Sequence, residues 1–154
     1  MEIDAFLADS VVLADGKVYA QGIGWNVLNS LQMPVRQNRI GIGLIIRVPY
    51  TATNQDHTFE LRLEQEDGDK MTLGDDPSGG RIEAFGGQFQ VGRPPGMVVG
   101  DEQIVPFALN IDGLVFEKAG RYIFVISLDG HETKRLPFRI VQIQQALPII
   151  QKGG

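Results

Sequence analysis

The chain has 154 residues, of which 43% are hydrophobic and 21% charged, and it contains no cysteine. That length supports one globular domain, and the missing cysteine excludes disulfides, thiolate metal sites and cysteine nucleophiles. The net charge of −5 argues against a nucleic-acid partner, because no excess of basic charge faces a polyanion.

Alternating apolar and polar residues predict strands along most of the chain, since period two marks a strand with one buried face. In chain order the predicted strands cover residues 11–13, 17–25, 40–48, 57–66, 71–73, 85–91, 105–111, 122–128 and 136–140. Ile45 stands on the opposite phase of its strand, which predicts that this strand is covered on both faces. Only residues 26–33 approach a helical pattern, and Pro34 ends it, so at most one short helix is expected there.

Asp-Gly pairs punctuate these runs, and this dipeptide supplies the positive φ angles of tight hairpin turns. They stand at residues 15–16, 67–68, 112–113 and 129–130, and two or three of them are predicted to be hairpin tips. Many short strands with such turns predict an all-β, antiparallel sandwich or barrel. We expect one domain over residues 1–143 and a C-terminal tail over residues 144–154.

Glycines at Gly22, Gly24, Gly41 and Gly43 form two Gly-x-Gly pairs that lack the third glycine and the helix of a dinucleotide site. Within strands they are expected to mark bulges or to seat a bulky neighbour such as Trp25 or Tyr19. Prolines at 106 and 137 lie inside strand-like runs, which predicts that they occupy edges or bulges.

No catalytic residue and no cofactor is assigned. His57 and His131 have no second histidine at a metal-ligand spacing, and both are predicted at the surface. None of the serines lies in a Gly-x-Ser-x-Gly elbow. An acidic run offers calcium ligands, but it lacks the Asp-x-Asp-x-Asp-Gly spacing, so a solvated hairpin tip is the favoured interpretation. The metal candidates, which we consider weak, are Asp67, Asp69, Asp75 and Asp76.

Trp25 is the only tryptophan, and packing in the core is favoured for it over stacking on a ligand or anchoring an interface. With Tyr50 and Arg93 it completes the candidate residues for a ligand site or an interface. The terminal Gly153-Gly154 matches the end of ubiquitin-like modifiers, but the rest of the chain lacks the central helix of that fold.

The first nine residues carry three acids, where a secretory signal needs a positive start and an apolar core. No apolar run approaches the roughly 20 residues of a membrane helix. We therefore expect a cytoplasmic protein without a membrane partner.

The chain resembles a family of small bacterial proteins of the actinobacterial type that have no established function. The residues that carry this resemblance are 8–9, 15–19, 22–25, 46–50, 91–96, 105–110, 119–122 and 136–139. The resemblance implies an immunoglobulin-like β-sandwich, here of about 8–10 strands, and it transfers no catalytic residue.

Three functional hypotheses follow. The first is a non-enzymatic module that acts through protein–protein contacts, with another protein or by self-association into a homo-oligomer. The second is a small-ligand or carbohydrate binder built around Trp25, Tyr50 and the loop that begins at Arg93. The third is a hydrolase whose site is assembled from distant strands.

Overall fold

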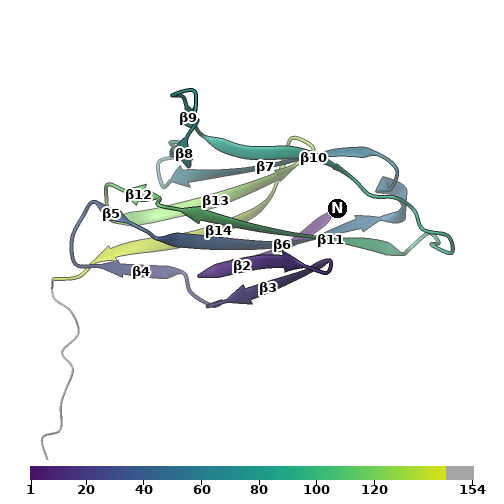
Figure 1. The fold of residues 1–154 in the computed structure, drawn as a ribbon, viewed down its shortest axis with the longest axis horizontal. Helices are drawn as coiled ribbons and strands as arrows, with labels where there is room; N and C mark the ends of the chain where they lie inside the picture. The colour runs from purple at the N-terminus through teal and green to yellow at the C-terminus, as the bar shows by residue number, and fades with distance from the viewer. Residues whose placement is uncertain (145–154) are drawn as a thin grey trace, which may run out of the picture.

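Two β-sheets pack face to face in the computed structural model, which describes residues 1–144, and their strands run along the long axis of the molecule (Figure 1). The first sheet has the order β1 (Glu2–Ala8), β6 (Arg39–Pro49), β11 (Glu102–Asp112). The second has the order β10 (Ala84–Gln90), β7 (Asp56–Gln65), β13 (Gly120–Leu128), β14 (His131–Gln142), β4 (Val27–Ser30).

Three two-stranded pieces and one 3-10 turn complete the described part of the chain. The pieces are β2 (Ser10–Ala14) with β3 (Lys17–Gln21), β5 (Val35–Arg36) with β12 (Val115–Phe116), and β8 (Gly74–Asp75) with β9 (Arg81–Ile82). The turn, η1, covers Tyr50–Ala52. The predicted all-β class is confirmed, and ten strands of the described residues are four or more residues long. All pairings between strands are antiparallel except that of β4 with β14.

The core lies between the inner faces of the two sheets. Along β13, the alternate residues Tyr122, Phe124 and Ile126 point inward and are fully or almost fully buried, as their period predicted. The two aromatic rings contact Phe138 of β14, which stacks on Tyr122 at 5.8 Å and on Phe124 at 5.5 Å between ring centroids. Each buried aromatic ring removes a large apolar area from water, so these rings stabilise the packing of the two sheets.

Strand β6 is covered on both faces, as the phase of Ile45 predicted. Its even positions from Ile40 to Val48 face the core with at most 1% exposure. On the opposite face Gly41 and Gly43 are also buried, because the β2–β3 hairpin and the Phe6 ring lie over them. These glycines therefore seat neighbours, although the neighbours are Ser10 and Phe6 rather than Trp25 or Tyr19.

The arrangement is compatible with an immunoglobulin-like sandwich. The Tyr122 hydroxyl near the start of β13 donates a hydrogen bond to the Lys118 carbonyl four residues upstream. A similar hydrogen bond, called a tyrosine corner, recurs in immunoglobulin-like domains.

The short helix considered for residues 26–33 does not form. Residues 27–30 instead make β4, which extends the sheet beside β14 through the Arg139 N–H bonded to the Asn26 carbonyl at 2.8 Å. Two turns of helix are marginal by themselves, whereas the edge of β14 satisfies the extended backbone. One predicted boundary was wrong, because β3 ends at Gln21 rather than at residue 25. The strand predicted for residues 71–73 does not form. Strand β1 was not predicted, since its burial does not follow a strict alternation.

Two of the Asp-Gly pairs are hairpin tips, in line with expectation. Asp15 and Gly16 join β2 to β3 with φ angles of 51° and 68°, and Asp129 and Gly130 join β13 to β14 with 51° and 77°. Positive φ at both central residues defines the type I′ turn that matches strand twist.

Pro106 lies in β11, an edge strand of the first sheet. The partner of Pro137 is Ile123 in β13, while β4 begins its pairing with β14 only at Arg139. On its other side, β14 therefore has no partner at Pro137 among the described residues. The edge positions predicted for both prolines are confirmed.

Residues 1–144 contain no helix long and apolar enough to cross a bilayer. The predicted tail, Gly153-Gly154 included, lies outside the described residues apart from Gln144.

Candidate functional site

Two of the candidate residues meet at one end of the sandwich, where β6 runs into η1. The Arg93 guanidinium lies over the Tyr50 ring, with its central carbon 3.7 Å from the ring centroid. The same guanidinium donates to the Tyr50 carbonyl at 2.9 Å and to the Thr53 hydroxyl at 2.8 Å. The Thr53 hydroxyl in turn donates to the Tyr50 carbonyl at 2.7 Å. Arg93 therefore holds the 50–53 turn in place with its own hydrogen-bond donors.

His57 continues this polar cluster and corrects the surface position that its sequence context predicted. Its side chain is only 5% exposed, whereas His131 is exposed as expected. Nδ1 lies 2.8 Å from the Asp129 carboxylate, and Nε2 lies 2.7 Å from the Ala52 carbonyl. The histidine was misjudged because Asp129 is 72 residues away in the sequence, and only the fold brings it near.

Both ring nitrogens of His57 face acceptors, so the arrangement favours the doubly protonated imidazolium. Burial lowers the pKa of His57, but the hydrogen bonds to Ala52 and Asp129 outweigh it and leave the pKa raised. The backbone N–H of Thr58 and the His57 ring together lower the pKa of Asp129. A catalytic base needs a nitrogen free to take a proton, and neither nitrogen of this histidine is free. The role of His57 is therefore structural: its ring links the segments that contain Ala52 and Asp129 to the start of β7.

Trp25 lies far from this cluster. Its ring packs edge-on against Phe138, with centroids 6.3 Å apart, beside the start of β13. His57 and Asp129 lie at the other end of β13, and Leu128 is six positions along the strand from Tyr122, a distance of about 20 Å. The structure thus brings Tyr50 and Arg93 together and leaves Trp25 out. Its indole N–H is buried without an acceptor among residues 1–144.

The four metal candidates do not converge. Asp67 accepts the backbone N–H of Asp69 at 2.9 Å, and Asp76 accepts that of Ser78 at 2.9 Å, so each stabilises its own turn. The Ser78 N–H lowers the pKa of Asp76. Asp75 lies in β8. Within the described residues no three His, Asp or Glu side chains are grouped for a metal ion.

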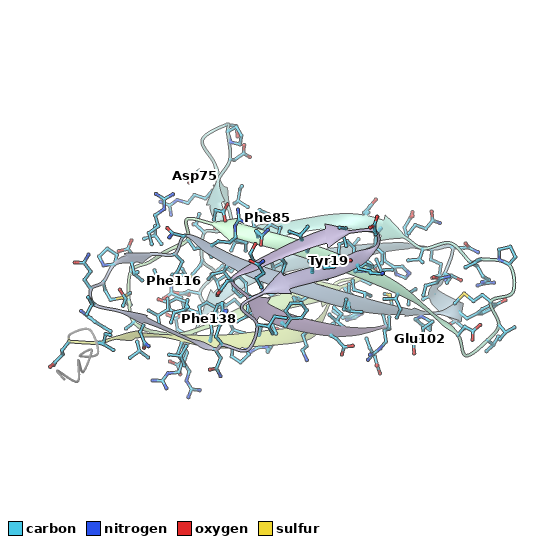
Figure 2. The ribbon with its side chains drawn as sticks, turned by 60° about the horizontal axis from the view of Figure 1, so that its bottom comes forward. Tyr19, Asp75, Phe85, Glu102, Phe116 and Phe138 are labelled. Atoms are coloured by element: carbon cyan, nitrogen blue, oxygen red, sulfur yellow. The ribbon has the colours of Figure 1, made fainter. Side chains whose placement is uncertain are left out.

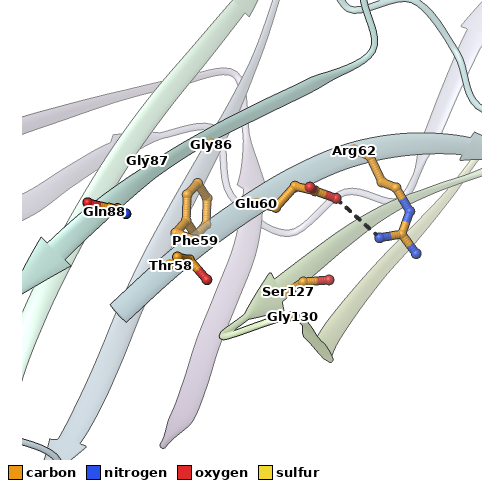
Figure 3. A pocket seen from close by; sticks show the side chains of 9 residues that line it. All are labelled: Thr58, Phe59, Glu60, Arg62, Gly86, Gly87, Gln88, Ser127 and Gly130. Atoms are coloured by element: carbon orange, nitrogen blue, oxygen red, sulfur yellow. Dashed lines mark ion pairs between the residues drawn. The ribbon is translucent and has the colours of Figure 1, made fainter. Parts of the chain in front are cut away.

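A polar hollow opens on the outer face of the second sheet, over β7 and β10 (Figure 3). Its volume is about 450 Å³, and Gly86, the direct strand partner of Glu60, adds no side chain to it. Arg62 reaches Glu60 at 3.6 Å across its rim. The residues that line it are Thr58, Phe59, Glu60, Arg62, Gly86, Gly87, Gln88, Ser127 and Gly130.

An exposed apolar surface on the β2–β3 hairpin is the feature that sequence reasoning missed as a site. Four of the ten large hydrophobic side chains exposed in the described chain belong to residues 12–23, and we call them the hairpin patch: Val12 at 55%, Leu13 at 49%, Tyr19 at 54% and Ile23 at 58% exposure. Val12 and Tyr19 are direct cross-strand partners and so project from one face, whereas Leu13 projects from the other face and Ile23 follows the end of β3. The sequence carried a signal for this exposed surface, because residues 11–13 are all apolar and a strand must direct some of them away from its buried face.

The hairpin is held firmly beneath this patch. Val11 is 1% exposed, and its N–H and C=O both bond the side-chain amide of Asn110 in β11, at 3.0 and 2.8 Å. Gly41 lets the Ser10 backbone approach β6 closely. Figure 2 shows the hairpin lying in front of the other strands with Tyr19 on it. The patch is therefore presented on a preorganised support.

Residues 3–141 match the sequence model of a protein family that is described as a family of unknown function, DUF6941. No curated protein matches the chain. Among solved structures it is similar to the Pseudomonas fluorescens alkylpurine DNA glycosylase AlkC bound to DNA containing an abasic site analog, with 13% identity and a TM-score of 0.40 over 75% of this chain and 27% of that one. It is also similar to the β-glucosidase from Listeria innocua in complex with glucose, with 9% identity and a TM-score of 0.39 over 90% of this chain and 16% of that one. The chain thus spans about a quarter and about a sixth of those two chains, and at such TM-scores neither carries an argument.

Proposed function

The chain belongs to the DUF6941 family, whose function is unknown, and we propose from its own surface that it is a non-enzymatic module acting through protein–protein contacts. The observation that carries the proposal is the hairpin patch. Val12 and Tyr19 expose large apolar side chains next to each other on one face, and adjoining apolar side chains of this kind are a feature of interaction sites. The partner we infer is a protein whose apolar face covers Val12 and Tyr19.

The polar cluster around Arg93 and His57 favours a protein-binding module over a hydrolase. Both nitrogens of His57 are engaged, and Arg93 is occupied by Tyr50 and Thr53. The net charge of −5 favours a protein over a nucleic acid as the partner.

A double substitution tests the proposal: Val12→Glu with Tyr19→Glu places two charges on the outer face of the hairpin. Sedimentation at increasing protein concentration measures self-association, and affinity capture from native lysate measures other partners. We expect the double variant to lose the self-association or the partner that wild type shows, with an unchanged melting temperature. The matched control is Val98→Glu with Val99→Glu, which alters two hydrophobic residues of similar exposure outside the strands. A wild-type monomer without partners, or equal binding by both double variants, contradicts the proposal.

The polar hollow supports a second candidate, the binding of a small polar ligand or carbohydrate. Its glycine-lined wall leaves space beside Glu60, Arg62 and Gln88, three side chains able to hydrogen-bond hydroxyl groups. A variant with Glu60→Ala and Gln88→Ala would remove two of these hydrogen-bonding side chains from the hollow. We expect amide NMR shifts caused by mono- and disaccharides to disappear in this variant, and their persistence contradicts the candidate.

A further inference from the structure

Arg121 and Arg139 stand directly opposite each other on neighbouring strands. Arg121 in β13 is the register partner of Arg139 in β14, and both side chains are exposed. Directly paired residues of an antiparallel sheet hold their Cβ atoms roughly 4.5–5.5 Å apart, and like charges so placed destabilise the sheet. Two adjacent positive charges therefore call for a compensating anion.

Within the described residues, no carboxylate forms an ion pair with either arginine, although Glu66 and Asp67 line a neighbouring pocket with Arg121. None of the ion pairs formed within residues 1–144 involves Arg121 or Arg139. The neighbouring arginines of the same sheet face differ in this respect. Arg62 contacts Glu60, Glu64 and Glu132 at 3.3–3.6 Å, and Arg135 binds Glu132 at 3.0 Å.

The two arginines also border a surface hollow of mixed character. Its volume is about 290 Å³, and its lining residues are Asn26, Val27, Arg121, Pro137, Phe138 and Arg139. Val27 is 41% exposed, so an apolar side chain lies within the hollow beside the guanidinium groups. An occupant therefore needs both an anionic group and an apolar part.

We propose that Arg121 and Arg139 form a binding site for a small organic phosphate, with its phosphate between the two guanidinium groups and its apolar part against Val27 and Pro137. Each guanidinium presents donors in a planar fork that matches two phosphate oxygens. A dianionic phosphate monoester balances both charges, which a single carboxylate does not. The site is independent of the hairpin patch, which lies on another element.

The test is an NMR titration of the full chain at constant ionic strength with three probes: phenyl phosphate, inorganic phosphate and phenol. We expect phenyl phosphate to bind most tightly, inorganic phosphate more weakly and phenol not measurably, with shifts centred on residues 26–27, 121 and 137–139. Arg121→Ala with Arg139→Ala should weaken phenyl phosphate binding at least about tenfold, which corresponds to 1.4 kcal/mol. The control Arg81→Ala removes an exposed arginine whose strand partner is Asp75, and its affinity should stay within about twofold of wild type.

Folding of the variants is checked separately. Removing one of two repelling charges should leave or raise the melting temperature of Arg121→Ala at low salt, and added salt should reduce this difference. If Arg121→Ala is misfolded, Arg121→Lys with Arg139→Lys keeps the charge without the forks and should still bind less tightly than wild type. Unchanged phenyl phosphate binding in the double alanine variant, equal affinity for phenyl phosphate and inorganic phosphate, or no binding by wild type overturns the proposal. The Val12→Glu with Tyr19→Glu variant should bind phenyl phosphate as wild type does, which would show that the phosphate site does not depend on the hairpin patch.

Discussion

The ring of Phe6 lies across the backbone of Gly43, its direct partner on the neighbouring strand. A Cβ atom added to Gly43 would overlap the Phe6 ring, so glycine is required there for steric reasons. An aromatic ring over a strand glycine covers backbone that glycine leaves bare. The Phe6 ring thus covers β6 at Gly43, two residues from Gly41, which the β2–β3 hairpin covers through Ser10.

Gly43→Ala should therefore destabilise the protein. We expect the free energy of unfolding in urea to fall by about 1–3 kcal/mol, the usual cost of forcing an extra methyl into a packed site. The matched control is Gly87→Ala in β10, where an added Cβ meets nothing within 4 Å and the change should stay within about 0.5 kcal/mol. Equal losses in the two variants would show that strand propensity, rather than the Phe6 contact, decides the effect.

The buried hydrogen bond of the tyrosine corner gives a second prediction. Tyr122→Phe removes the hydroxyl that donates to the Lys118 carbonyl, and it should lower the free energy of unfolding by about 1–2 kcal/mol. Tyr19→Phe, at a tyrosine that is 54% exposed, should change stability by no more than about 0.5 kcal/mol. Urea unfolding of both variants under one condition provides the comparison.

The pH dependence of stability should reveal the His57–Asp129 pair. The pKa of His57 is raised in the folded protein, so its contribution is complete below the ordinary histidine value of about 6.5 and is lost as pH rises through the folded pKa. The pKa of Asp129 is lowered, so its contribution is present above the ordinary aspartate value of about 3.9 and is lost as pH falls through the folded pKa. The pair is therefore most stabilising between these two values.

Comparison of wild type with His57→Gln by urea unfolding at pH 6 and pH 9 measures this effect. The stability difference between the two proteins should be larger at pH 6. His131→Gln, which changes the exposed histidine, should show no such dependence. A difference for His57→Gln that is the same at both pH values would mean that the ring acts only by packing.

The Asn110 side chain should control the order of the β2–β3 hairpin. Asn110→Ala removes both partners of the Val11 backbone groups, and amide hydrogen exchange should accelerate in residues 10–21 more than in β13. Partner binding through the hairpin patch should weaken in parallel, because the support is less preorganised. Asn29→Ala changes an exposed asparagine of β4 and should leave hairpin exchange at the wild-type rate. Uniform acceleration across the whole protein would indicate global destabilisation instead.

Local chemistry in the sequence determined the class of fold and much of its detail. The alternation in 122–128 predicted the inward faces of Tyr122, Phe124 and Ile126, because side chains of a strand point to opposite sides whatever lies around it. The Asp15-Gly16 and Asp129-Gly130 turns followed from the φ angles that these residues tolerate. Family membership also followed from patterns spread along the chain.

Contacts between distant residues were decided only by the tertiary structure. Tyr50, Arg93 and Trp25 were predicted together as candidate residues. The structure brings Tyr50 and Arg93 into contact, and their separation from Trp25 depends on which end of the sandwich each segment reaches. The burial of His57 depends on Asp129, and the apposition of Arg121 and Arg139 depends on the register of β13 with β14. Register and sheet packing are set by the whole core at once, so a local pattern does not encode them.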